Sequence, residues 1–333
     1  MGHGRRQFLL AASAMAATRL AGAQGREGIY RIGFLIQRPP AGIEARLVAA
    51  LGSRGWKEGG NYILEIGVAG NDPARWDAVA NELLRKRVDL VVALGSHMAL
   101  VAKRATATVP VVMMLSGYPV VAGIVASLSQ PGGNITGLRT YVDGIWGKYL
   151  EFARELVPQL RTLGVLSDYV PPGFVAAETD HALGELQRAA KSLGVALQQW
   201  RVSDQAGLER ALAEIEGTAV DALLVTGGPT HAQPRNTGRI REFLLRRKLA
   251  MVNDIPGSVF RDAGGIMAYA VSFQEVAART ASFIERIRRG AKPRNLPIEQ
   301  PTQFELALNV KNARAIGLVV PQSLLLRADR VIE

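Results

Sequence analysis

The sequence predicts an α/β protein made of two similar lobes, each with a doubly wound parallel sheet. Beyond the first two dozen residues, short aliphatic or β-branched runs alternate with helix-length amphipathic stretches, which is the order of βαβ units. The chain has 333 residues, more than a single hydrophobic core usually holds. The strand-like runs of the first half recur in the same order in the second half. Repetition on this scale indicates two related domains.

In the first half, strand-like runs alternate with helical patterns. Strands are expected at Arg31–Gln37, in the stretch NYILEIGVAG, at Val88–Ser96 and at Val109–Gly117, with helices at 42–54, Pro73–Arg87 and His97–Ala105 between them. The helical period is clearest in Pro73–Arg87, where apolar residues recur at three- and four-residue spacing.

The second half repeats this order. TLGVLSD (162–168) corresponds to RIGFLIQ, VDALLVTGG (220–228) to VDLVVALGS, and LAMVNDIPG (249–257) to VPVVMMLSG, with helices expected at 177–193 and 237–247. A Gly-Gly turn then follows in each half, in SQPGGNITGL and in RDAGGIMAYA. Each turn either ends a lobe and leads the chain toward the other lobe, or is an ordinary turn. In the first case, a bulky side chain at Gly133 or Gly265 should disturb folding or closure rather than ligand chemistry.

Composition argues against an enzyme. The chain has no Cys, which excludes disulfides, thiol nucleophiles and Cys-based metal sites, and its four His form no metal-binding motif. Neither G-x-G-x-x-G nor a P-loop follows a predicted strand, and G-x-S-x-G is absent. We therefore expect no catalytic residues, no bound metal and no cofactor. A nucleotide-dependent enzyme is the third choice among the functions.

The formal net charge is +11, and many Lys and Arg residues recur at helical spacing between Arg235 and Lys248. This spacing is typical of a solvated helix face, and no aromatic-interleaved basic run supports nucleic-acid binding. A basic surface also suits anionic ligands or a membrane surface. We expect no nucleic-acid partner.

The first residues resemble an export signal. Arg5 and Arg6 precede an apolar stretch from Phe8 to Ala17, and small residues at 21–23 provide a cleavage site near Ala23. The order Arg-Arg-Gln-Phe-Leu resembles a twin-arginine signal. Because the apolar stretch is shorter than the roughly 20 residues that span a bilayer, a membrane anchor is disfavoured. We expect residues 1–23 to be removed and the protein to be periplasmic.

Candidate ligand-binding residues follow the predicted strands, because doubly wound sheets bind ligands at the carboxyl ends of their strands. In the first half these are Gln37, Arg38, Ser96, His97, Ser116, Gly117 and Tyr118. In the second half they are Asp168, Tyr169, Gly227, Gly228, Pro229, Asn253, Asp254 and Tyr269.

Several of these residues have a structural alternative. Ser96 either holds a ligand carboxylate with nearby amides or is a plain helix N-cap. Asp168 and Asp254 either receive a ligand ammonium group or cap helices. Arg38 either pairs with an anion or is a solvated loop residue, and His97 is expected to be a loop histidine rather than a catalytic base.

Several stretches together resemble one family: PVVAGIVASLSQPGGNITGL, KYLEFARELVPQLRTLGVL, AGGIMAYA and the tail GAKPRNLPIEQPTQFELALNVKNARAIGL. They are similar to the periplasmic substrate-binding components of ABC transporters related to the tryptophan/tyrosine-type binding proteins. The resemblance implies a type I periplasmic-binding fold, in which two lobes are joined by a hinge of three crossing strands. It implies lobe one at 28–139 plus 271–302 and lobe two at 140–270 plus 303–333. Tyr269 would then lie at the hinge.

The sequence departs from this family at the predicted cleft. Many relatives carry Gly-Asp-Pro after the strand equivalent to VVMML, whereas this chain has Gly117-Tyr118-Pro119. The TGGPT stretch lacks the Asp-Asn pair that the aromatic amino-acid binders carry there. Tyr118 and Tyr169 offer flat faces to a ring or an apolar substrate instead. An amino-acid ligand is therefore not transferred directly from the family.

Two functions remain in view. The first is a monomeric solute-binding protein of an ABC importer, which captures a small molecule such as an amino acid, aromatic or carboxylate compound and delivers it to an inner-membrane permease. The second is a periplasmic ligand-sensing module that signals to a membrane receptor. Both use the same fold and cleft.

Overall fold

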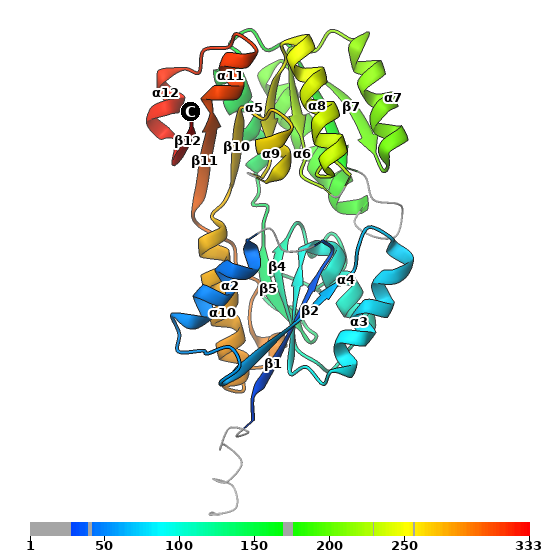
Figure 1. Cartoon of the computed structure of the whole chain (residues 1–333), viewed down its shortest axis with the longest axis vertical. Helices are drawn as coiled ribbons and strands as arrows, with labels where there is room; N and C mark the ends of the chain where they lie inside the picture. The colour runs from blue at the N-terminus through cyan, green and yellow to red at the C-terminus, as the bar shows by residue number, and fades with distance from the viewer. Residues whose placement is uncertain (1–27, 39–41, 169–175, 229, 256) are drawn as a thin grey trace, which may run out of the picture.

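A computed structural model describes residues 28–38, 42–168, 176–228, 230–255 and 257–333. The expected export signal, residues 1–23, lies outside the described residues. Figure 1 shows two α/β lobes stacked along the long axis, with several segments of the chain passing between them. Within the described residues, no helix combines the length and the apolar character needed to cross a membrane.

The first lobe contains a five-stranded parallel sheet in the order β2-β1-β3-β4-β5. Its strands are β1 (Tyr30–Ile36), β2 (Tyr62–Val68), β3 (Leu90–Leu94), β4 (Val111–Ser116) and β5 (Ile135–Arg139). Its helices are α2 (Ile43–Gly52), α3 (Trp76–Arg85), α4 (Gly95–Ala105) and α10 (Phe273–Arg288), with 3-10 turns at Pro73–Arg75 and Pro293–Asn295.

Both faces of this sheet are buried, as is usual for parallel sheets. Alternate residues of β1 point to opposite faces, so Phe34 packs beneath α2 and α10 while Leu35 packs beneath α3 and α4. The aliphatic runs read from the sequence are therefore strands covered on both sides. The helix α10 packs against α2 and β4, although both lie far from it in the sequence.

The second lobe contains a seven-stranded sheet in the order β12-β11-β10-β9-β8-β6-β7. Its strands are β6 (Thr162–Asp168), β7 (Ala196–Val202), β8 (Ala222–Val225), β9 (Ala250–Asn253), β10 (Met267–Val271), β11 (Phe304–Asn309) and β12 (Arg330–Ile332). Its helices are α5 (Ile145–Leu156), α6 (Ala176–Leu193), α7 (Gln205–Glu216), α8 (Pro234–Arg247), α9 (Ser258–Asp262), α11 (Val310–Ala315) and α12 (Gln322–Arg327).

The two sheets confirm the predicted α/β fold and its internal repetition. The order β7-β6-β8-β9-β10 in the second lobe reproduces β2-β1-β3-β4-β5 in the first, and all of these neighbours pair in parallel. This is the order of a doubly wound sheet. The sheet of the second lobe is mixed, because β11 pairs antiparallel with β10.

Three segments of the chain lead from one sheet to the other. The chain leaves the first lobe after β5, returns after β10 into α10, and enters β11 after residues 296–303. These segments run side by side, because Arg139 N donates to Glu299 O at 3.1 Å and Ser272 N donates to Gln303 O at 2.8 Å. Both Gly-Gly turns directly precede strands that lead into such a segment, β5 and β10.

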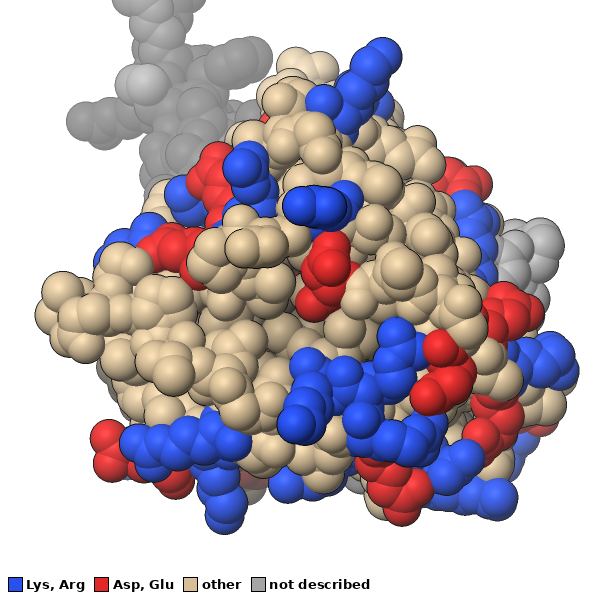
Figure 2. All heavy atoms as spheres, turned by 90° about the horizontal axis from the view of Figure 1, so that it is seen from above, with Lys and Arg blue, Asp and Glu red and all other residues tan. Residues whose placement is uncertain are grey.

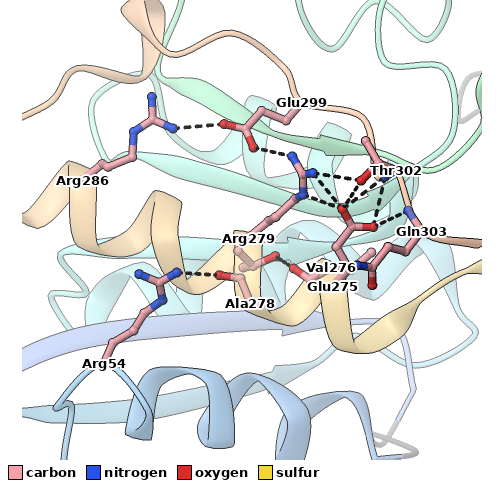
Figure 3. Close-up of polar contacts among 10 residues, drawn as sticks. Arg54, Glu275, Val276, Ala278, Arg279, Arg286, Glu299, Thr302 and Gln303 are labelled. Carbon is pink, nitrogen blue, oxygen red and sulfur yellow. Dashed lines mark hydrogen bonds and ion pairs between the residues drawn. The ribbon is translucent and has the colours of Figure 1, made fainter.

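One carboxylate fastens the third of these segments to α10 (Figure 3). Glu275 accepts hydrogen bonds from the backbone N–H groups of Thr302, at 3.0 Å, and Gln303, at 2.8 Å. Arg279, on the next turn of α10, pairs with both Glu275 and Glu299. The hinge region therefore contains a charged network that joins a helix of the first lobe to the segment entering β11.

Basic residues gather at the outer end of the second lobe, where Figure 2 shows them interspersed with acidic ones. On α8, Arg239 pairs with Glu209 and Glu242, and Arg246 pairs with Glu216. These are exposed ion pairs, the kind expected of a solvated helix face.

Candidate functional site

A cavity of about 280 Å³ lies between the two lobes, at the carboxyl ends of their strands. The first lobe contributes residues that follow β3 and β4, and the second lobe contributes residues at the ends of β6, β8 and β9. Parallel strands end at one edge of a sheet, and ligands of doubly wound proteins bind at that edge. The volume suits a small molecule.

The structure brings many of the predicted site residues to this cavity. Those that line it are Ser96, His97, Gly117, Asp168, Gly227, Gly228 and Asp254. Those that the structure places elsewhere are Gln37, Arg38, Ser116, Tyr118, Asn253 and Tyr269. Tyr169 and Pro229 lie outside the described residues. Ligand binding by any of them stays a prediction.

Ser96 organises the wall of the cavity on the first lobe. Its hydroxyl accepts a hydrogen bond from Gly117 N at 2.9 Å and lies 3.0 Å from the Ser116 hydroxyl. The N-cap of α4 is Leu94, so the alternative that Ser96 is a plain N-cap is wrong. Ser116 lies behind Ser96 and is fully buried, which makes it a support for the cavity wall.

Glu178 is a cavity residue that the sequence analysis missed. It lies in the first turn of α6, in the second lobe, and its Oε1 accepts hydrogen bonds from Ser96 Oγ at 2.9 Å and Tyr118 N at 2.7 Å. Burial raises the pKa of its carboxyl to about 7, although both hydrogen bonds act in the opposite direction. The signal was present in the sequence, because Glu178 falls on the same helical stripe as Ala182 and Leu186.

Two further carboxylates line the second-lobe side. Asp168 Oδ2 accepts hydrogen bonds from the backbone N–H groups of Thr230 and His231, while Asp254 accepts from Gly227 N and from the Tyr141 hydroxyl. The N-cap of α9 is Gly257, so the capping alternative is wrong for Asp254. Burial raises the pKa of Asp254 to about 6 despite these bonds. Asp168 Oδ1 is buried and has no hydrogen-bond partner in the described part of the chain.

The loop after β8 approaches these carboxylates so closely that it requires glycine. A Cβ at Gly228 would lie 2.3 Å from the Cβ of Asp168, and one at Gly227 would lie 2.1 Å from the Ile255 side chain. Arg38, from the loop after β1, interacts electrostatically with Asp168. Burial is nevertheless the main influence on Arg38, and it lowers the pKa of the guanidinium.

His97 lies at the cavity with its ring against Trp76, at 5.6 Å between centroids. Burial lowers its pKa to about 4, so the imidazole is neutral at neutral pH. Asn253 is fully buried and donates from Nδ2 to Val225 O, which ties β9 to β8.

The side chains of both described tyrosines among the candidates lie away from the cavity, although the backbone amide of Tyr118 donates to Glu178 at the cavity wall. The ring of Tyr118 packs in the second-lobe core, where its hydroxyl donates to Glu185 and accepts from Trp146 Nε1. The expectation that Tyr118 offers a flat face to a ligand is therefore not met, because the phenol has protein partners at both its ring and its hydroxyl. Tyr269 stacks on Phe304 at 5.3 Å beside the hinge.

The remaining walls are mostly apolar, with side chains of Trp146, Val165, Leu183, Ile255 and Phe273. Trp146 is both buried and a cavity residue. Within the described residues, no group of His, Asp and Glu has the arrangement of a metal site. The cavity thus combines hydroxyl and amide donors on one lobe with carboxylates on the other, between apolar walls.

Comparisons with known proteins agree with this architecture. The profile of the family described as ABC transporter substrate binding protein matches residues 42–332. A tyrosine-binding protein of Clostridioides difficile is 23% identical over 279 residues, which cover 81% of this chain and 75% of that protein.

Two examples illustrate the solved structures that share the fold. One is an ABC domain in complex with L-Trp from Streptococcus pneumoniae, with 21% identity and a TM-score of 0.82 over 92% of this chain and 100% of that chain. The other is a ligand-free, open substrate binding protein with adhesive properties from Clostridium difficile, with 20% identity and a TM-score of 0.68 over 91% and 99%. The expected type I periplasmic-binding fold and the family resemblance are confirmed.

Proposed function

Because the chain belongs to the ABC transporter substrate binding protein family, whose members are solute-binding proteins rather than enzymes, we propose that it is the receptor of an ABC importer. It captures a small molecule between its lobes outside the cytoplasm, closes around the three-segment hinge and delivers the molecule to an inner-membrane permease. A ligand that contacts both lobes favours the closed arrangement over the open one.

One observation carries the choice of ligand: the cavity has opposite chemistry on its two sides. The first lobe offers the Ser96 hydroxyl and the backbone amide of Tyr118, which suit a carboxylate. The second lobe offers the carboxylates of Asp168 and Asp254, which suit an ammonium group. A zwitterionic α-amino acid satisfies both sides.

The apolar walls favour an amino acid with an apolar or aromatic side chain. Trp146 and Phe273 provide aromatic surface, and the tyrosine-binding and L-Trp-binding relatives point to the same class. L-tyrosine and L-tryptophan are therefore the first ligands to test, although the substitution of Tyr for Asp at position 118 is a reason to include other amino acids.

Calorimetry with the protein lacking residues 1–23 tests this function. We expect L-tyrosine or L-tryptophan to bind, and both tyramine, which lacks the carboxylate, and 3-(4-hydroxyphenyl)propionate, which lacks the ammonium group, to bind at least about tenfold more weakly. Asp254→Asn should weaken binding of the amino acid, whereas Asp180→Asn, an exposed change on α6, should not. Failure of every amino acid to bind or to stabilise the protein would contradict the proposed ligand class.

Transport and sensing share this cleft, so a second measurement separates them. We expect cells that lack the gene to lose uptake of the radiolabelled ligand, and uptake to return with the wild-type gene. Unchanged uptake together with a lost transcriptional or chemotactic response would favour the ligand-sensing alternative.

A further inference from the structure

The carboxylate of Glu178 occupies a site formed by the opposite lobe. Glu178 belongs to α6 in the second lobe, yet both donors to its Oε1, Ser96 Oγ and Tyr118 N, belong to the first lobe. Its Oε2 lies over the Cα of Gly117, where an added Cβ would be only 3.0 Å away. The residue is only 8% exposed, so it is enclosed at this position.

The donors at this site are oriented before any ligand arrives. The Ser96 hydroxyl has a single proton, which it gives to Glu178, so the contact of 3.0 Å with Ser116 has Ser116 as its donor. Gly117 N donates to the same Ser96 oxygen. A carboxylate of any origin placed here receives one hydroxyl and one amide hydrogen bond without rearrangement of the first lobe.

The same face of α6 also binds the side chain of Tyr118, the residue whose backbone supplies this amide. Glu178 accepts from the backbone of Tyr118, and Glu185, seven positions further along α6, accepts from the Tyr118 hydroxyl at 2.6 Å. Residues seven apart lie on one face of a helix. The helix of the second lobe therefore holds Tyr118 at both ends, through two carboxylates.

The chemistry of this contact allows a ligand carboxylate to take the place of Glu178. Among the described residues, the partners of the Glu178 carboxyl are a hydroxyl and an amide, and no cation is paired with it. A buried carboxylate without a counter-charge is costly, whereas a ligand that brings its own carboxylate restores the hydrogen bonds and lets Glu178 return to water.

We propose that Glu178 is an internal competitor for the ligand: in the free protein its carboxyl group fills the carboxylate subsite of the first lobe and holds the lobes together, and a ligand carboxylate binds by displacing it. This inference rests on the proposed capture of an amino acid, and it adds how that capture is regulated. Removal of a competing residue strengthens ligand binding, whereas removal of a residue that contacts the ligand weakens it.

Two measurements on Glu178→Ala test the proposal. The chain has no Cys, so labels can be placed on cysteines introduced at Glu82 of α3 and Arg210 of α7, both exposed, to report the distance between the lobes. Without ligand, we expect this distance to increase in Glu178→Ala and to stay unchanged in Asp180→Ala, a control on the same helix turn. An unchanged distance in Glu178→Ala would overturn the proposal whether or not any ligand is known.

The second measurement is affinity. If the competitor fills the subsite in nine molecules of ten, its removal raises affinity for L-tryptophan or L-tyrosine by about tenfold. Tryptamine, which has no carboxylate, should gain less. Weaker binding of the amino acid to Glu178→Ala would instead make Glu178 a ligand contact and overturn the competition.

Two further outcomes are informative. If neither amino acid binds either protein while the lobes still separate in Glu178→Ala, the proposed ligand fails and the contact between the lobes stands. If Glu178→Ala does not fold, Glu178→Gln replaces it. The side-chain amide oxygen introduced by this substitution still accepts from Ser96 and Tyr118, so the variant should keep the lobes together and should not bind more weakly than wild type.

Discussion

Tyr118 and Trp146 meet across the boundary between the lobes. The backbone of Tyr118 follows β4 of the first lobe, but Trp146 Nε1, on α5 of the second lobe, donates a hydrogen bond to its hydroxyl at 2.9 Å. The same hydroxyl donates to Glu185 at 2.6 Å, and the ring lies 4.6 Å from that of His181. One side chain of the first lobe is thus part of the second-lobe core.

Replacement of Tyr118 by Phe removes this hydroxyl, so that Trp146 Nε1 loses its acceptor and Glu185 loses a hydrogen-bond donor. Because the indole N–H is buried, we expect a loss of about 1–3 kcal/mol in the free energy of unfolding, measured by urea denaturation. Tyr62→Phe is the matched control, because its ring is equally buried and its hydroxyl forms no hydrogen bond with a described residue. Equal stability changes in the two variants would contradict the argument.

Much of this lobe boundary could not have been predicted from the sequence. The aliphatic runs predicted β1, β3, β4, β6, β8 and β9, because buried parallel strands are apolar along their whole length. β7 was missed, since its sequence ALQQWRV is neither an aliphatic run nor a regular alternation, as fits a mostly half-exposed edge strand. The helices α5, α7 and α12 were not identified at all. Strand ends located Ser96, Asp168 and Asp254 at the cavity. The position of the Tyr118 side chain depends on its hydrogen bonds with Trp146 and Glu185, which lie 28 and 67 residues away in the sequence, so no local pattern indicates it.

The two Gly-Gly turns look alike in the sequence, but the structure constrains their glycines in different ways. The structure shows no close neighbour that constrains Gly133, because a Cβ there has no heavy atom within 4 Å, so the effect of a bulkier residue stays a prediction. The constraint lies one residue earlier, since Gly132 has φ of 89°. At Gly265 the constraint is steric, because a Cβ would lie 2.3 Å from Asn253 Oδ1 and 2.8 Å from Phe260 O.

We therefore expect Gly265→Ala to lower the free energy of unfolding by about 1–3 kcal/mol, because neither backbone nor a buried amide can move away cheaply. Gly133→Ala should change it by less than about 0.5 kcal/mol. Thermal or urea denaturation of the two variants gives the comparison. A larger loss for Gly133→Ala than for Gly265→Ala would invert this order and contradict the packing around β10.

The distance between the lobes should depend on pH through Glu178. Burial raises the pKa of its carboxyl from 4.5 to about 7, so the enclosed side chain binds a proton more tightly than one in water. Its contribution to the closed arrangement is complete below about pH 4.5 and is lost as pH rises through about 7. In ligand-free protein labelled at Glu82 and Arg210, we expect the lobes to separate between pH 5 and 8.

Other ionisable groups around the cavity must be distinguished from Glu178. They are His97 on α4, Asp168 at the end of β6, Asp254 after β9, and Tyr141 between β5 and α5. Burial lowers the pKa of His97 to about 4 and raises that of Asp254 to about 6. Glu178→Gln has no proton to lose but keeps these groups, so its distance should be flat above pH 6. If the distance between the lobes in Glu178→Gln changed with pH as it does in wild type, the change would belong to Asp254 and not to Glu178.

Glu275, at the hinge, contributes stability that depends on pH in the opposite direction, because its pKa is lowered rather than raised. Burial alone would raise the pKa of its carboxyl, but the hydrogen bonds from Gln303, Thr302 and Arg279 together hold it below the ordinary value. A lowered pKa adds stability above the unfolded-state value of 4.5, and this stability is lost as pH falls through the folded-state pKa.

Glu275→Ala should therefore lower the free energy of unfolding at pH 7 by about 2–3 kcal/mol, because two backbone N–H groups of the third crossing segment lose a charged partner. The difference from wild type should shrink as the pH is lowered below 4. Glu285→Ala is the control on the same helix, since its ion pairs with Arg54 and Arg289 lie nearer the surface and contribute at most about 1 kcal/mol. If both variants lose the same stability, Glu275 is an ordinary surface carboxylate. A larger loss that is confined to Glu275→Ala would make the joint between α10 and residues 302–303 a stabilising part of the crossing segments.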